Sequence, residues 1–161
     1  MHSLPSLHLA LGDPRLCQRG RLQSCYTGVM IERTANPRKQ GDAGMGIAIS
    51  WFARNGYTVC IPLTDSQKYD LVVEHHERHE GVQRVQVKTT TQCKLKNGIY
   101  QVDLRTQGGN RSGAGKVTVL SERDADLLFI VSPLKCYLVP TSIIQGRRSI
   151  SLGEKVEQYS C

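Results

Sequence analysis

The sequence predicts an α/β (α+β) fold, because one helical stretch is followed by a series of strand-like runs. Apolar residues recur at helical spacing in residues 42–55. From residue 57 onward, short apolar runs and runs of period two predominate. The chain has 161 residues, enough for one domain with a hydrophobic core. We therefore expect one domain that combines a helix with a sheet.

The predicted helix covers residues 42–55. Its apolar residues at helical spacing are Ile47, Ala48, Trp51 and Phe52. Gly41 or Asp42 can cap its start, and the pair Asn55-Gly56 is a typical stop.

Gly44 and Gly46 weaken the first turn of this helix by roughly 1 kcal/mol each relative to alanine. Such a cost suggests that the backbone closely approaches another part of the structure. We expect helix-to-sheet packing here rather than contact with a phosphate.

The strand-like runs follow in order after the helix. The first three are residues 57–63, 69–73 and 82–91, and the later ones are residues 98–106, 126–131 and 136–139. The last two indicate a hairpin around residues 132–135. The glycine-rich residues 107–116 are a loop by composition. The element after the third run is expected to be a further strand rather than a helix.

The third run carries polar side chains on one face. Its period of two places Arg84, Gln86 and Lys88 on one side and Val85 and Val87 on the other. One face is therefore expected to be core, and the other to be a site or a solvated surface.

Asp70 stands at the start of the second run, on the opposite face from its apolar neighbours. If the second and third runs pair, a carboxylate, an amide oxygen and an ammonium converge at one end of a small sheet. Magnesium takes oxygen ligands and keeps several waters, so Asp70, the Gln86 carbonyl, a backbone carbonyl and phosphate oxygens can complete its shell. The alternative is an amphipathic hairpin with a solvated polar face.

Asp70 followed by Gln86-Val87-Lys88 resembles the motif of the PD-(D/E)XK nucleases, with Gln where most members carry Asp or Glu. The flanking sequence resembles the branch that includes group-I-intron-associated homing endonucleases, and the resemblance covers about residues 40 to 144. It is carried by residues 41–44, 55–57, 62–67 and 85–90. It implies a restriction-endonuclease-like core, a central mixed β-sheet flanked by helices.

The resemblance also implies an activity. The expected protein is a Mg²⁺-dependent (or Mn²⁺-dependent) endonuclease that cuts double-stranded DNA and leaves 5′-phosphate and 3′-hydroxyl ends. Asp70, Gln86 and Lys88 would be catalytic, with Asp70 and Gln86 as metal ligands. A homodimer or homotetramer is expected, because cleavage of a duplex needs two active sites.

The sequence departs from the family pattern on the first helix. Many members carry a metal-binding Glu there, and the matching position here is Met45. Asp42, about one turn earlier, either substitutes for it or only caps the helix. Two alternatives therefore stay open: a catalytically inactive DNA-binding protein of the same fold, and an enzyme resembling Holliday-junction resolvases.

The charge of the chain favours a polyanionic partner. The formal net charge is +7 and the isoelectric point is about 9.3. Arg105, Arg111 and Lys116 alternate with glycines, which allow close approach to phosphates, so we expect them to contact DNA. The alternative is a solvated loop, or a DNA-tracking arm in the basic N-terminal residues.

Three other groups are weaker candidates for a metal site. His75, His76 and His79 lie among glutamates in an expected hairpin turn and are interpreted as solvated surface. Asp124 and Asp126 precede an apolar run and suggest a turn and strand entry. Asp65 is interpreted as a turn residue.

The predicted organisation has three parts. Residues 1–38 are expected to be a flexible basic extension, residues 39–146 the nuclease-like domain and residues 147–161 a polar tail. The six cysteines lack the spacing of a zinc or redox motif, which favours reduced thiols and a cytoplasmic location. No run is apolar and long enough for a membrane span, and no convincing signal peptide is present.

Overall fold

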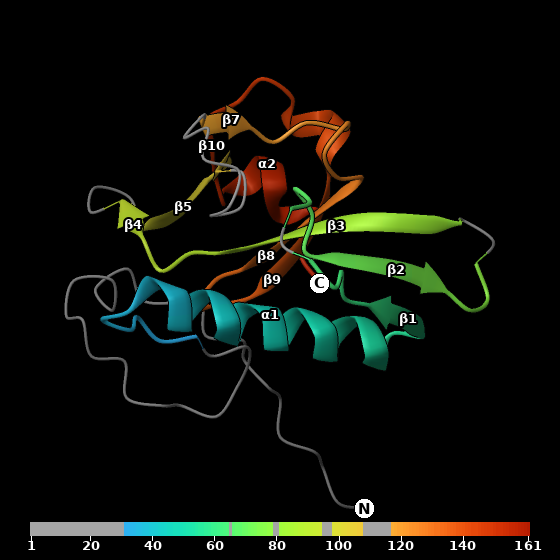
Figure 1. Cartoon of the computed structure of the whole chain (residues 1–161). Helices are drawn as coiled ribbons and strands as arrows, with labels where there is room; N and C mark the ends of the chain where they lie inside the picture. The colour runs from blue at the N-terminus through green and yellow to red at the C-terminus, as the bar shows by residue number, and fades with distance from the viewer. Residues whose placement is uncertain (1–30, 65, 79–80, 95–97, 108–116) are drawn as a thin grey trace, which may run out of the picture.

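The fold is a mixed five-stranded sheet with a long helix on one face and smaller elements on the other (Figure 1). It is seen in a computed structural model that describes residues 31–64, 66–78, 81–94, 98–107 and 117–161. The sheet order is β1-β2-β3-β8-β9. The β3 and β8 strands are parallel and the other pairs are antiparallel, so the expected mixed sheet is confirmed.

The helix and the strands have the following bounds. The five strands of the main sheet are β1 (Tyr57–Cys60), β2 (Leu71–His75), β3 (Val82–Thr89), β8 (Leu127–Val131) and β9 (Cys136–Pro140). The smaller sheets comprise β4 (Cys93–Lys94), β5 (Ile99–Asp103) and β10 (Ser149–Ser151), and β6 (Arg105–Gln107) with β7 (Val117–Val119). The helical elements are α1 (Pro37–Arg54), the 3-10 helix η2 (Thr141–Ile144) and the short α2 (Glu154–Glu157).

The α1 helix starts five residues earlier than the sequence pattern suggested. Asn36 caps it, since its side-chain oxygen accepts a hydrogen bond from the Arg38 N–H at 2.9 Å. Pro37 then occupies the first helical position, where its missing N–H costs nothing. Gly41 and Asp42 therefore lie inside the helix and do not cap it. The predicted stop is correct, because Asn55 is the C-cap.

Two apolar clusters lie on the two sides of the main sheet. Strand β8 supplies both, because Phe129 and Val131 pack into the cluster under α1 while Leu128 and Ile130 pack into the opposite one. This double burial explains why the β8 sequence is continuously apolar. On the α1 side, Phe52 makes edge contacts with Trp51 and Tyr57.

The last fifteen residues are part of the fold, which corrects the expected polar tail. Ile150 and Leu152 are buried in the cluster opposite α1. Ser160 forms a β-bridge with Tyr137. The alternation of apolar and polar residues in β10 is too short to be distinguished from a tail by sequence alone. At the other end, Ile31 is buried under α1, so the folded part begins before residue 39.

The expectation of reduced thiols is corrected for one cysteine. Cys60 ends the edge strand β1 and is exposed. The thiols of Cys136 and Cys161 are free, as is that of Cys60, whereas Cys93 is disulfide-bonded. Within the described residues, no helix is long and apolar enough to cross a membrane.

Candidate active site

Asp70 lies immediately before β2, where the chain already pairs with β3. Its N–H donates to the Val85 carbonyl at 2.8 Å. Its Oδ2 atom accepts the Val87 N–H at 2.7 Å and also an N–H of the Gln86 amide. Burial raises the pKa of Asp70, while the Val87 N–H and the nearby Lys88 charge lower it. The carboxylate is thus desolvated but not isolated.

Gln86 is directed toward Asp70 from the middle of β3. Only 8% of the residue is exposed, a low value for an amide. Its Nε2 donates to Asp70 and also lies 3.3 Å from the Val87 carbonyl oxygen. The period-two expectation holds here, since Val85 and Val87 belong to the cluster under α1.

Lys88 lies two residues further along the same face of β3. Its Nζ atom donates to the Arg105 carbonyl at 3.1 Å. Burial lowers the pKa of Lys88, and the charges of Asp70 and Asp103 raise it. A partly buried ammonium is well placed to bind an incoming anion.

These three side chains line a cleft of about 850 Å³. The chain around the start of α1 forms one wall, the end of β3 forms the floor, and β5 and β6 form the other wall. The structure therefore brings together the three residues that the sequence singled out.

The wall formed by α1 contains both helix positions that the sequence analysis compared with the metal-binding Glu of the family. Asp42 and Met45 line the cleft together with Asp70. The interpretation of Asp42 as a cap is wrong, because Asn36 has that role and Asp42 lies in the second turn. Asp42 is exposed and forms no ion pair among the described residues.

The donor set fits a cation that prefers oxygen ligands. Asp70 offers its second carboxylate oxygen, Oδ1, and Gln86 offers its carbonyl oxygen, since neither atom has a hydrogen-bond partner in the described residues. The described residues contain no group of three or more His, Cys, Asp or Glu side chains that could hold a metal ion. The site is therefore weakly charged and suits a cation that retains several waters.

The residues expected to contact DNA are only partly described. Arg105 lines the cleft, but its guanidinium is paired with Asp103, with Nε 2.9 Å from both carboxylate oxygens. Arg111 and Lys116 lie outside the described residues. Contact of all three with DNA stays a prediction.

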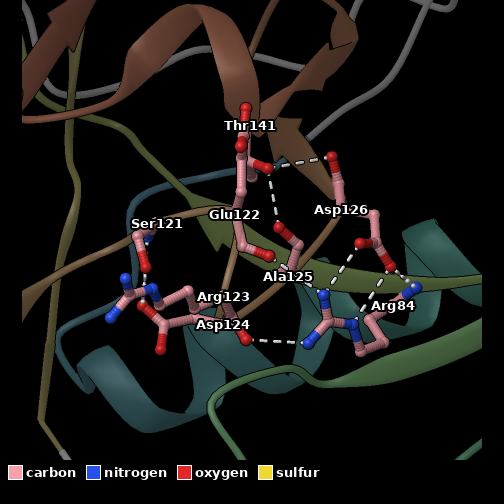
Figure 2. Close-up of polar contacts among 8 residues, drawn as sticks. All are labelled: Arg84, Ser121, Glu122, Arg123, Asp124, Ala125, Asp126 and Thr141. Carbon is pink, nitrogen blue, oxygen red and sulfur yellow. Dashed lines mark hydrogen bonds and ion pairs between the residues drawn. The ribbon is translucent and has the colours of Figure 1, made fainter.

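Arg84 shares a face with Gln86 and Lys88 but has a different role (Figure 2). Its guanidinium reaches Asp126 at 2.8 Å and the carbonyls of Glu122 and Arg123 at 2.9 and 2.8 Å. Its backbone N–H also donates to Asp126. Arg84 thus links β3 to the turn that precedes β8.

Asp124 and Asp126 belong to this turn, in agreement with the sequence interpretation. Asp124 accepts a hydrogen bond from Ser121 and pairs with Lys68 at 3.0 Å. Burial raises the pKa of Asp124, but these two contacts lower it by more, so the pKa lies below its usual value. Figure 2 also shows the Thr141 hydroxyl donating to the Ala125 carbonyl at 2.6 Å. Both aspartates are therefore structural.

The histidines do not assemble a metal site within the described part of the chain. His75 is the last residue of β2 rather than a turn residue, and its Nδ1 accepts from the backbone N–H groups of Glu77 and Arg78. His76 approaches the Thr58 hydroxyl at 3.4 Å. His79 and Asp65 lie outside the described residues.

Comparison with known proteins shows the family to which the chain belongs. The family model described as "PD-(D/E)XK endonuclease" matches residues 35–159. A solved structure titled "The structure of a bacterial homing endonuclease: I-Ssp6803I" is similar with a TM-score of 0.62 and 25% sequence identity, covering 79% of this chain and 89% of that one. No curated protein matches. Because the family model spans more than three quarters of the sequence, the chain belongs to the PD-(D/E)XK endonuclease family.

Proposed function

We propose that this endonuclease hydrolyses phosphodiester bonds of double-stranded DNA with the help of Mg²⁺ or Mn²⁺. The observation that carries the proposal is the contact of Asp70 with Gln86 and Val87 at the floor of a cleft that also contains Lys88. Membership of the family and the similarity to a homing endonuclease support DNA as the substrate.

Each of the three side chains has a distinct role in this proposal. Asp70 and Gln86 would hold the cation through their free oxygens, and the Val87 N–H fixes the orientation of the Asp70 carboxylate. A bound divalent cation would supply Lewis acidity at the phosphate and lower the pKa of a water. Lys88 would neutralise charge that develops on the phosphate in the transition state.

Partial burial strengthens the effect of Lys88. The charge of a partly buried ammonium acts through a lower effective dielectric constant than that of an exposed lysine. The Arg105 carbonyl holds the Lys88 ammonium in place before the substrate arrives. Preorganisation of this kind contributes to catalysis because little reorganisation is needed during the reaction.

A second copy of the chain is also part of the proposal. Cleavage of both strands of a duplex needs two active sites, and one cleft of this type is found in the described residues. We propose a homodimer or homotetramer on this ground. The cytoplasm stays the predicted compartment.

One observation favours a second candidate function. Met45 supplies no charge to the cleft where many family members carry a Glu, so Asp70 is the single carboxylate that contacts Gln86 among the residues that the structure describes. A protein with this site could bind DNA without cutting it. The two functions differ in whether cleavage occurs, not in where the DNA lies.

Incubation of the purified protein with plasmid and with branched DNA, in Mg²⁺, Mn²⁺ or EDTA, tests the proposal. Linear plasmid in Mg²⁺ or Mn²⁺ and none in EDTA is the expected result. Selective cutting of the branched DNA would instead indicate a resolvase-like substrate. Binding without cutting in either metal would establish the inactive alternative.

A further inference from the structure

A second, smaller hollow adjoins the catalytic cleft. It has a volume of about 230 Å³ and is lined by Gln92, Gln101, Asp103, Arg105, Arg148 and Ser149. The first four of these residues also line the cleft. The two hollows therefore share a wall, and we refer to the smaller one as the Arg148 pocket.

The charge of the Arg148 pocket depends on Arg148. Asp103 and Arg105 neutralise each other through their ion pair, which also lowers the pKa of Asp103. Arg148 is exposed and forms no ion pair with any residue that the structure describes. The pocket thus has one uncompensated positive charge surrounded by amide and hydroxyl groups.

The pocket is firmly attached to the catalytic strand. The Thr90 hydroxyl, two residues after Lys88, donates to the Gln101 carbonyl at 2.6 Å. The Gln101 side chain donates to the Ser149 hydroxyl at 2.7 Å, which joins β5 to β10. An anion held beside Arg148 would therefore keep a fixed position relative to Lys88.

We propose that the Arg148 pocket binds a backbone phosphate of the DNA away from the scissile bond, a proposal that rests on the proposed function. A guanidinium forms strong, charge-assisted hydrogen bonds with phosphate oxygens. Gln92 is exposed at the rim, where its amide can donate a further hydrogen bond. Contacts of this kind position a duplex without reading its sequence.

The ion pairing of the two arginines that line the pocket indicates that Arg148, not Arg105, is available to bind a phosphate. Arg105 would have to leave Asp103 before it could bind a phosphate, whereas Arg148 has no carboxylate to give up among the described residues. Arg147 precedes Arg148, is also exposed and lines neither hollow. It is therefore a matched control with the same change of net charge.

The test is DNA binding measured by fluorescence anisotropy in EDTA, so that cleavage does not interfere. Wild type, Arg148→Ala, Arg148→Lys and Arg147→Ala are titrated into two duplexes of unrelated sequence at several salt concentrations. We expect Arg148→Ala to weaken binding to both duplexes and to reduce the slope of log affinity against log salt by about one. Arg148→Lys should keep most of the slope, and Arg147→Ala should match wild type.

The result that overturns the proposal is an Arg148→Ala protein with the same slope and affinity as Arg147→Ala. The proposed function would survive that result, because wild type would still bind the duplexes. If wild type binds neither duplex, both the proposed function and the Arg148 pocket are rejected. Thermal unfolding of each variant shows whether a weaker binder is still folded.

Discussion

The Asp70 carboxylate accepts the backbone N–H of Val87 at 2.7 Å, which ties the start of β2 to the strand that carries Gln86 and Lys88. This hydrogen bond fixes the Asp70 carboxylate relative to the side chains of Gln86 and Lys88. The donor is a backbone N–H, so its position does not depend on a side-chain rotamer. The cost is burial of the carboxylate, which raises the pKa of Asp70.

Asp70→Asn should abolish cleavage and at the same time stabilise the protein near neutral pH. The raised pKa means that folding disfavours the ionised form, so stability is lost as the pH rises through the folded-state pKa of Asp70. Asn removes that charge and can still accept the Val87 N–H. The melting temperatures of wild type and Asp70→Asn at pH 7 and at pH 3 measure the change in stability. The gain should be present at pH 7 and absent at pH 3, and a lower melting temperature at pH 7 would contradict it.

Lys88→Ala should reduce the cleavage rate about 10²–10³-fold, as is typical when one preorganised transition-state stabiliser is lost. Lys39→Ala is the control, because Lys39 is exposed on α1 and does not line the cleft. Single-turnover cleavage at saturating DNA measures the rates. Equal rates for the two variants would remove Lys88 from the active site.

Gln86→Glu should retain part of the activity, with a rate that rises at a higher pH than in wild type. The new carboxylate would touch Asp70 where an N–H now donates, and two adjacent carboxylates raise the pKa of one of them. Gln86→Leu offers no oxygen and should be inactive. The pH dependence of the cleavage rate distinguishes the three proteins, and an active Leu variant would show that Gln86 holds no cation.

Met45→Glu should strengthen binding of Mn²⁺, by about tenfold, because affinity rises with the number of charged oxygen ligands. Met45 lines the same cleft as Asp70, so the added carboxylate enters the site. Met45→Gln has the same length without the charge and is the control. Calorimetric titration of the DNA-free protein with Mn²⁺ measures affinity independently of cleavage. Identical affinities of the two variants would show that position 45 does not reach the cation.

The placement of the main candidate site residues could be predicted because it depends on local rules. A period of two is enough to place Gln86 and Lys88 on one face of β3, and the flanking similarity identifies Asp70 as their partner. The helix start differs from the expectation, because the cap Asn36-Pro37 lies within residues 1–38, which the sequence predicts to be an extension.

Other features could not be predicted, because they depend on contacts between distant parts of the chain. The parallel pairing of β3 with β8 joins Gln86 to Leu128. The Arg148 pocket needs β10 to lie beside β5, and no local pattern indicates which strand will be its neighbour. The pairing of Arg105 with Asp103 could have been suspected from their spacing, since alternate residues of an extended chain lie on one side.

The two helix glycines offer a matched test of how closely α1 packs against β3. A Cβ atom at Gly44 would overlap the Thr89 hydroxyl and lie 3.1 Å from the Thr89 Cβ, whereas one at Gly46 would meet nothing within 4 Å. Gly44→Ala should therefore destabilise the protein by about 1–3 kcal/mol. Gly46→Ala should stabilise it by about 0.5–1 kcal/mol through helix propensity.

Urea unfolding of both variants measures these changes, and Thr89→Ala identifies their cause. Thr89 follows Lys88, so the contact of Gly44 with Thr89 sets the distance between α1 and the end of β3 where the cleft lies. Removing the Thr89 hydroxyl removes the atom that the new methyl group would overlap. The cost of Gly44→Ala should then be smaller in a Thr89→Ala background, by an interaction free energy that a double-mutant cycle gives directly. An equal cost in both backgrounds would mean that Gly44 is needed for some reason other than its contact with Thr89.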